Sequence, residues 1–171
     1  MDQTTTISVG NPSELFIGAG TDGPSDVVID ASQEILIWHG CGDLLRHAGM
    51  RPTHQRLVLG SFLFSKGGRH VTAGSLHAEV TAAGVHLSRA TVYNTLHQFT
   101  DAGLLRQIGI DGSKSYFDTN PIRHHHFFVD QECSLLDVPE PGVLIDPLPE
   151  PLPGYEIAGV DVVVHLRRKQ G

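Results

Sequence analysis

Several features are scarce in this chain of 171 residues, and each scarcity excludes a class of protein. Two cysteines, Cys41 and Cys133, are too few for a disulfide-stabilised fold and lack the C-x-x-C spacing of a structural zinc site. No stretch approaches the roughly 18 consecutive apolar residues of a membrane helix, and the first residues lack the basic and apolar regions of an export signal. These absences predict a cytoplasmic protein in a reducing compartment, with no membrane partner.

The remaining composition is that of a folded, globular chain. Hydrophobic residues make up 40%, charged residues 18% and aromatic residues 6%, which is neither a disordered nor a fibrous composition. The length fits one domain with tails or two small domains and excludes a large multidomain enzyme.

Basic residues are also scarce overall, yet they are concentrated in one region. The formal net charge is −7, from 12 basic and 19 acidic residues, which taken whole argues against a nucleic-acid binder. However, residues 51–118 hold seven bases and four acids, whereas residues 1–50 and 119–171 are both acidic. The middle of the chain is therefore a basic module between two acidic segments.

The central residues have the pattern of short helices followed by a hairpin. A short helix ends at Gly49, a second has Thr53 as N-cap and stops at Gly67-Gly68, and a third has Thr72 as N-cap, without the acidic partner of a full capping box. A fourth begins at Ser88, ends at Gly103, and is expected to pack through Ala90, Tyr93, Leu96 and Phe99. Asp111-Gly112 then joins two β-prone runs. This order is that of a winged helix-turn-helix.

The rest of the chain predicts a second, smaller module. Residues 119–123 read as a hinge; HHHFFVD and SLLDV read as short strands, a proline-rich segment can hold little helix, and Val160 to Leu166 is a β-branched run. The predicted fold class is thus α+β, with limits at 1–32 for a mobile arm, 33–118 for the winged helix, 119–123 for the hinge and 124–171 for the second module.

The fourth helix is the predicted DNA-reading element. Base recognition needs side chains that reach the major groove from a rigid helix, and basic residues that hold phosphates. The helix offers Arg89, Thr91, Tyr93 and Asn94, and neighbouring segments offer Arg51, Arg56, Arg69, Arg106 and Lys114. An ordinary amphipathic helix with a solvated face, a Tyr93 that belongs to the core, or a protein-docking winged helix remain alternatives.

A second group of residues has the chemistry of metal ligands. His70, Asp118, His124, His126 and Asp137 offer the imidazoles and carboxylates that suit zinc, iron or manganese. In an extended strand alternate side chains share a face, so His124 and His126 point together and His125 points away.

Four stretches of the chain resemble the ferric uptake regulator family of metal-dependent, dimeric transcription factors: RPTHQRLVLGSFLF, HVTAGSLHAEV, LSRATVYNTLHQFTDAGLL and DGSKSYFD. The words WHGCGDLLRHAGMRPTHQR, YFDTN, HHHFF and GYEIAGVDVVVHLRRK resemble its iron response regulator branch, found in α-proteobacteria. The resemblance runs from about Trp38 to Lys169. It implies a repressor that binds a palindromic, A·T-rich operator as a homodimer, with the second module as dimerisation domain.

The resemblance also assigns sites. His70, Asp118, His124, His126 and Asp137 fall on the ligands of the site that bridges the family's two domains. Arg123 and Val160 replace histidines of the second site, Val129 and Glu132 stand where the first cysteine pair of the structural zinc would be, and Cys133 is expected in a strand.

In the iron response branch, the His124, His125 and His126 run is the proposed haem-binding element, with His39 as a further candidate. The N-terminal haem motif is incomplete, because Leu36-Ile37 replace its Cys-Pro. The resemblance implies release from DNA by haem and control of haem synthesis and iron storage genes. The alternatives are a metal-dependent regulator that ignores haem, and, more remotely, a haem or metal-binding enzyme. No HExxH, nucleophile elbow or phosphate loop is found, so no enzyme is expected.

Overall fold

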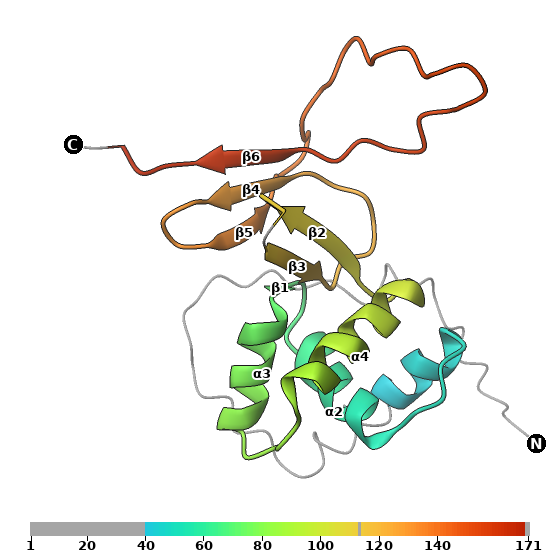
Figure 1. Ribbon diagram of the computed structural model, residues 1–171, viewed down its shortest axis with the longest axis vertical. Helices are drawn as coiled ribbons and strands as arrows, with labels where there is room; N and C mark the ends of the chain where they lie inside the picture. The colour runs from blue at the N-terminus through green and yellow to red at the C-terminus, as the bar shows by residue number, and fades with distance from the viewer. Residues whose placement is uncertain (1–39, 113, 170–171) are drawn as a thin grey trace, which may run out of the picture. The chain divides into compact units, whose positions relative to one another are not determined.

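The computed structural model describes residues 40–112 and 114–169. The chain divides after Arg69 into two compact units, whose described parts are residues 40–69 and 70–169. Figure 1 labels the elements from α2 to β6 along the chain. The predicted arm of residues 1–32 lies outside the described residues, and the predicted domain limits stay predictions. None of the described helices is both long and apolar enough to cross a membrane.

The described part of the first unit, residues 40–69, contains two helices, residues 40–47 and α2 (His54–Phe64). As predicted, the Thr53 side chain caps α2 by accepting from the Arg56 N–H, and Gly49 follows the first helix with a φ of 72°. A positive φ costs glycine little because it lacks a Cβ. The buried apolar side chains of this unit include Leu45, Leu59 and Leu63.

A close approach in the first unit explains a glycine inside a helix. Cys41 is buried, and its Sγ lies 3.8 Å from the carbonyl oxygen of Leu57. A Cβ placed on Gly60 of α2 would overlap that sulfur. Burial raises the pKa of the Cys41 thiol to about 11, so the thiol is protonated at neutral pH.

The second unit begins with β1 (His70–Val71) and α3 (Ala73–Ala82). Thr72 caps α3 by accepting from the Ser75 N–H at 3.0 Å, and the Ser75 hydroxyl accepts from the Thr72 N–H at 2.9 Å. The capping box is therefore complete, although its partner is not acidic, as the sequence indicates. The serine hydroxyl takes the place of the usual carboxylate because it too can accept a backbone hydrogen bond.

Helix α4 (Arg89–Asp101) starts at its predicted cap Ser88 and ends before Gly103, whose φ is 73°. It buries Val92, Leu96 and Phe99, together with Thr95. The predicted face was therefore wrong in part, because Ala90 and Tyr93 are exposed and the β-branched Val92 takes the buried position. Tyr93, 49% exposed, is thus presented outward with Arg89 and Asn94.

The predicted hairpin is confirmed. Strands β2 (Arg106–Ile110) and β3 (Lys114–Asp118) pair antiparallel, and Asp111 and Gly112 between them have φ values of 51° and 67°. Strand β1 pairs antiparallel with the other edge of β3, so the first sheet has the order β1-β3-β2.

A second sheet follows in the order β5-β4-β6. Strand β4 (His126–Val129) pairs antiparallel with β5 (Ser134–Asp137) and parallel with β6 (Val163–Leu166). The last strand begins three residues later than predicted, and Cys133 lies in the β4–β5 turn with a φ of 48°, not in a strand. Residues 138–162 form no helix or strand, as the prolines predict.

Both sheets contribute to one apolar core within the second unit. Ile108, Ile110 and Tyr116 of the hairpin pack with Phe128 and Leu135 of the second sheet. Side chains alternate along a strand, so Tyr116 and Asp118 share the face of β3 that this core covers. This packing therefore places the end of β3 close to the start of β4.

Candidate metal centre

Five ionisable side chains converge where the two sheets of the second unit meet. His70 begins β1 and Asp118 ends β3, and the two are Cα partners in the first sheet. His126 begins β4 and Asp137 ends β5, and these are partners in the second sheet. His124 comes from the connection before β4. One ligand atom from each residue lies within 4.8 Å of all the others.

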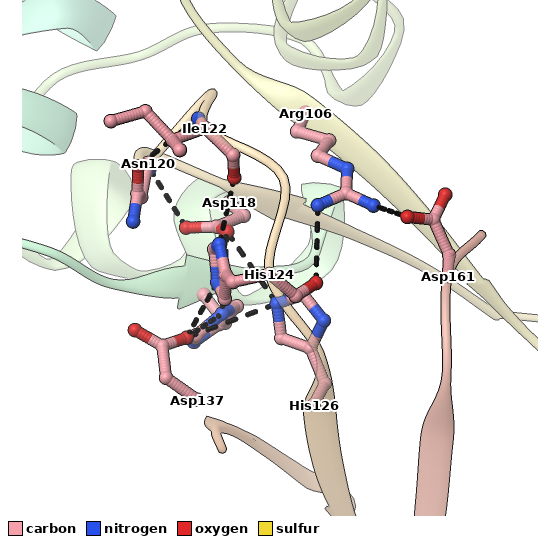
Figure 2. Close-up of polar contacts among 9 residues, drawn as sticks. Arg106, Asp118, Asn120, Ile122, His124, His126, Asp137 and Asp161 are labelled. Carbon is pink, nitrogen blue, oxygen red and sulfur yellow. Dashed lines mark hydrogen bonds and ion pairs between the residues drawn. The ribbon is translucent and has the colours of Figure 1, made fainter. Parts of the chain in front are cut away.

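The distances in this cluster are those of groups directed at a common point. His124 Nε2 lies 2.9 Å from an Asp137 oxygen and 3.1 Å from Asp118 Oδ2, and His70 Nε2 lies 3.0 Å from Asp137. His126 Nε2 lies 3.5 Å from Asp118 Oδ2. The cluster is drawn in Figure 2.

The buried atoms of the cluster provide a test of whether a cation fits. Asp118 and His126 are each 1% exposed. Asp118 Oδ2, His70 Nε2 and His126 Nε2 are inaccessible to water and have no hydrogen-bond partner in the described part of the chain. Buried polar atoms without partners are costly and rare. Three of them facing each other, with a donor set of three imidazoles and two carboxylates, fit a divalent zinc, iron or manganese ion.

The charge state of Asp118 agrees with this role. Burial by itself raises the pKa of the carboxyl group, but His126, His70 and the N–H of Asn120 favour the charged form more strongly. The net result is a pKa well below the ordinary range. The carboxylate is therefore ionised at any pH at which the imidazoles can bind a metal.

A short loop orients two of the candidate ligands. Asp118 Oδ1 accepts the Asn120 N–H at 2.8 Å, and Asn120 Oδ1 accepts the Ile122 N–H at 3.1 Å. His124 Nδ1 lies 2.7 Å from the Ile122 carbonyl oxygen, to which it must donate. This directs Asp118 Oδ2 and His124 Nε2 toward the other side chains of the cluster, and it selects the His124 tautomer that a metal ligand needs.

Arg106 secures the same loop from strand β2. Its guanidinium donates to the His124 carbonyl oxygen at 3.2 Å and pairs with the carboxylate of Asp161, ahead of β6 (Figure 2). Its side chain is 14% exposed. Arg106 was predicted as a phosphate contact, and this second role has no signal in the sequence, because only the register of β2 with β3 places Arg106 beside Asp118.

The predicted DNA contacts lie as follows. Arg89, Tyr93 and Asn94 are exposed on α4, whereas Thr91 is half-buried with its hydroxyl 2.8 Å from that of Ser88. Lys114 is exposed, with Nζ 3.1 Å from Cys133 Sγ.

In the first unit, Arg51 is exposed and the half-buried Arg56 donates to the Arg51 carbonyl oxygen at 2.8 Å. Arg69 donates to the Phe62 carbonyl oxygen at 2.9 Å. The phosphate contacts assigned to these residues stay predictions.

The histidines of the predicted haem element differ in their surroundings. His126 is buried and His124 faces the two aspartates. His125 points away, as predicted for alternate residues, and its Nδ1 accepts the Val162 N–H at 3.3 Å. His39 lies outside the described residues.

Comparison with known proteins assigns the family. The family model described as "Ferric uptake regulator family" matches residues 47–140, more than half of the chain. The chain belongs to the ferric uptake regulator family.

Relatives within this family include a "Ferric uptake regulation protein" of Shigella flexneri, 34% identical over 89 residues, which cover 52% of this chain and 60% of that protein. A "Peroxide-responsive repressor" of Staphylococcus aureus is 33% identical over 97 residues, 57% of this chain and 65% of the relative. The chain thus matches less than two thirds of the length of these curated ferric uptake regulator relatives.

Solved ferric uptake regulators share the fold. The protein of Pseudomonas aeruginosa with manganese superposes with a TM-score of 0.57 at 23% identity, over 76% of this chain and 98% of that one. The Vibrio cholerae protein has a TM-score of 0.59 at 19% identity, over 74% and 98%. The predicted fold class, a winged helix followed by a small α/β domain, is therefore confirmed.

Proposed function

We propose that this chain is a metal-responsive, DNA-binding transcriptional regulator that acts as a homodimer. The observation that carries the proposal is the cluster of His70, Asp118, His124, His126 and Asp137 on two sheets of one unit. Membership of the ferric uptake regulator family supports it, because the curated relatives are named as regulators or repressors. The domain limits of 33–118 and 124–171, joined by residues 119–123, belong to this proposal.

The mechanism follows from which elements supply the ligands. His70 lies on β1 and Asp118 on β3, in the sheet that contains the hairpin. His126 lies on β4 and Asp137 on β5, in the second sheet. When bound, a divalent cation supplies positive charge that the two carboxylates share. A cation held by all five residues would tie the wing to the second sheet and would restrict the angle at which a dimer presents its two α4 helices.

DNA is then read by residues on the exposed face of α4. Arg89, Tyr93 and Asn94 contact base edges, while Thr91, Lys114, Arg51 and Arg56 hold phosphates. A two-fold dimer matches a palindromic, A·T-rich operator, whose half-sites are related by the same symmetry.

The finer proposal is that the chain is an iron response regulator that haem releases from DNA, with haem synthesis and iron storage genes as targets. His124 and His126 belong both to the divalent-metal cluster and to the proposed haem element. Occupancy of one site by these residues therefore excludes full occupancy of the other. His125, outside the metal cluster, adds a third imidazole, whose Nδ1 accepts the Val162 N–H. A regulator that uses the metal cluster and ignores haem is the alternative.

The test is DNA binding by the purified full chain. A duplex is first selected from a random-sequence pool in the presence of manganese, and its affinity is then measured by fluorescence anisotropy with manganese, with a chelator, and with haem. We expect chelation to weaken binding, and Asp137→Asn to weaken it at limiting manganese, with Asp146→Asn as the matched control. No selected duplex, or equal affinity in chelator, would overturn the proposal.

Haem sensing is tested on the same duplex. We expect haem to weaken DNA binding by the wild-type chain. We also expect haem, titrated by absorbance, to bind less tightly to His125→Ala than to wild type. His47→Ala serves as the control for loss of an exposed histidine. Unchanged DNA affinity in haem leaves the metal-dependent regulator and removes the haem-sensing role.

A further inference from the structure

His97 of α4 is a half-buried histidine that neither the metal cluster nor the predicted DNA contacts use. Its ring lies between two aromatic rings. The centroid of Tyr93 is 4.3 Å away at an interplanar angle of 62°, and that of Phe117 is 5.4 Å away at 88°. Its Nε2 is inaccessible to water and has no hydrogen-bond partner among the described residues.

This nitrogen makes His97 a poor choice for simple packing. A buried polar atom without a partner lowers stability, whereas a leucine at the same helical position would pack without that cost. Edge-to-face contact between rings, by contrast, has a defined geometry that an aliphatic side chain does not impose. The contacts of His97 therefore orient a neighbour rather than merely fill space.

The neighbour on the outer side is Tyr93. It is 49% exposed and also lines a groove of about 790 Å³ bounded by Ser75, Lys114 and Phe117, among others. A tyrosine on a helix can adopt two χ1 rotamers. With an open groove on one side, the contact with the His97 ring restricts the choice between them.

The neighbour on the inner side, Phe117, is part of the strand pair that carries metal-cluster residues. Phe117 is fully buried and is the Cα partner of Val71, and the next pair along the same strands is Asp118 with His70. Because successive side chains point to opposite faces of a sheet, Asp118 faces the second sheet while Phe117 faces α4. The position of the β1–β3 pair thus sets the surface on which His97 rests.

We propose that His97 is a positioning residue that holds the Tyr93 ring in the orientation with which it contacts a thymine methyl group. The proposal rests on the proposed function, in which Tyr93 reads DNA. Phe117, which contacts His97, lies on one face of the β1–β3 pair, and the metal cluster lies on the other face. His97 itself touches no base, because its Nε2 is inaccessible to water and its ring contacts those of Tyr93 and Phe117.

The experiment measures discrimination between thymine and uracil, which differ by the one methyl group. Each thymine of the duplex selected on the wild-type chain is replaced in turn by uracil, and the ratio of dissociation constants is measured in manganese for wild type, Tyr93→Ala, His97→Leu and His97→Phe. His47→Leu is the matched control in the first unit. Burial of one methyl group corresponds to about a fourfold ratio.

We expect at least one position where the wild-type ratio is about fourfold and the Tyr93→Ala ratio is near one. At that position His97→Leu also lowers the ratio toward one, while its affinity for the uracil duplex stays within about twofold of wild type. His97→Phe keeps the ratio, because a ring still faces Tyr93. The χ1 angle of Tyr93 in the free protein, measured by NMR scalar couplings, changes in His97→Leu and not in His47→Leu.

The outcomes separate this inference from the function on which it rests. If His97→Leu weakens both duplexes equally and keeps the fourfold ratio, His97 is structural and the inference is wrong, although Tyr93 still reads thymine. If Tyr93→Ala also keeps the ratio, or wild type shows none, both the Tyr93 assignment and this inference fail. If the chain selects no duplex, the proposed function fails first. Should His97→Leu fail to fold, His97→Phe decides, because a ratio near one in that folded variant would overturn the inference.

Discussion

Replacing Arg106 with methionine should weaken metal binding without removing a ligand. Methionine preserves the length and packing of the side chain but removes the donor to the His124 carbonyl oxygen and the partner of Asp161. The first contact leaves a partly buried carbonyl unsatisfied, which costs about 1–3 kcal/mol. Asp161 is 54% exposed and is solvated by water once Arg106 is removed, so the loss of this ion pair adds little to the cost.

That cost converts into metal affinity because His124 is held before the metal arrives. If the loop of residues 119–125 loses its anchor, His124 must be ordered again when the metal binds, and affinity falls by the same free energy. We expect a decrease of about 10- to 100-fold, the range typical of residues that orient ligands without touching the metal. Arg106→Lys, which keeps one donor, should lie between wild type and Arg106→Met.

The assay is competition for manganese or zinc against a chromophoric chelator, with apo-protein folding checked by circular dichroism. Arg123→Met is the matched control, since Arg123 is 58% exposed and lies 3.8 Å from the same Asp161 oxygen without reaching His124. His124→Ala sets the limit for full loss of the ligand. Wild-type affinity in Arg106→Met, alongside a clear loss in His124→Ala, would refute the anchoring argument.

Three further predictions concern stability and reactivity. Folding lowers the pKa of Asp118 in the metal-free protein, so the charged carboxylate stabilises the fold above the unfolded pKa of about 3.9, and this stability is lost as the pH falls toward the folded pKa. The free energy of unfolding in urea should therefore exceed that of Asp118→Asn by less below about pH 4 than above it. A difference that stays constant with pH would contradict the lowered pKa. Gly60→Ala should destabilise the protein by about 1–3 kcal/mol despite the better helix propensity of alanine, because its Cβ overlaps Cys41 Sγ; thermal unfolding with the double variant Gly60→Ala/Cys41→Ala should show recovery, and its absence would remove the overlap as the cause. A thiol reagent at pH 8 should modify the exposed Cys133 rapidly and Cys41 only on unfolding, since burial raises the Cys41 pKa to about 11; two fast equivalents would show that Cys41 is accessible.

Local rules predicted the helix N-caps and the hairpin correctly, whereas α2 ends at Phe64, three residues before the predicted stop at Gly67-Gly68. Thr53, Thr72 and Ser88 cap their helices, and Asp111-Gly112 adopts the positive φ values of a tight turn, because each depends on a few adjacent residues. The buried face of α4 was predicted less well. Periodicity alone could not tell whether Val92 or Tyr93 faces inward, since that choice depends on what the neighbouring elements present.

The candidate metal site was predicted by residue type and family resemblance, and its internal support was not. Histidines and aspartates spaced along residues 70–137 suggested one cluster, which the structure brings within 4.8 Å. The roles of Arg106 and Asn120 had no signal in the chain, because a guanidinium or amide acquires such a role only from the backbone atoms beside it. The DNA contacts, dimer and haem element stay predictions.

Residue order alone thus settled where the helices begin, where the hairpin turns, and which side chains have the chemistry to bind a cation or DNA, since these properties belong to single residues and their near neighbours. Only the tertiary structure decided the pairing of His70 with Asp118 and of His126 with Asp137. It also decided the core that joins the two sheets and the contact of His97 with Phe117. These depend on strand register and on contacts between distant segments, which are set by the packing of the whole unit.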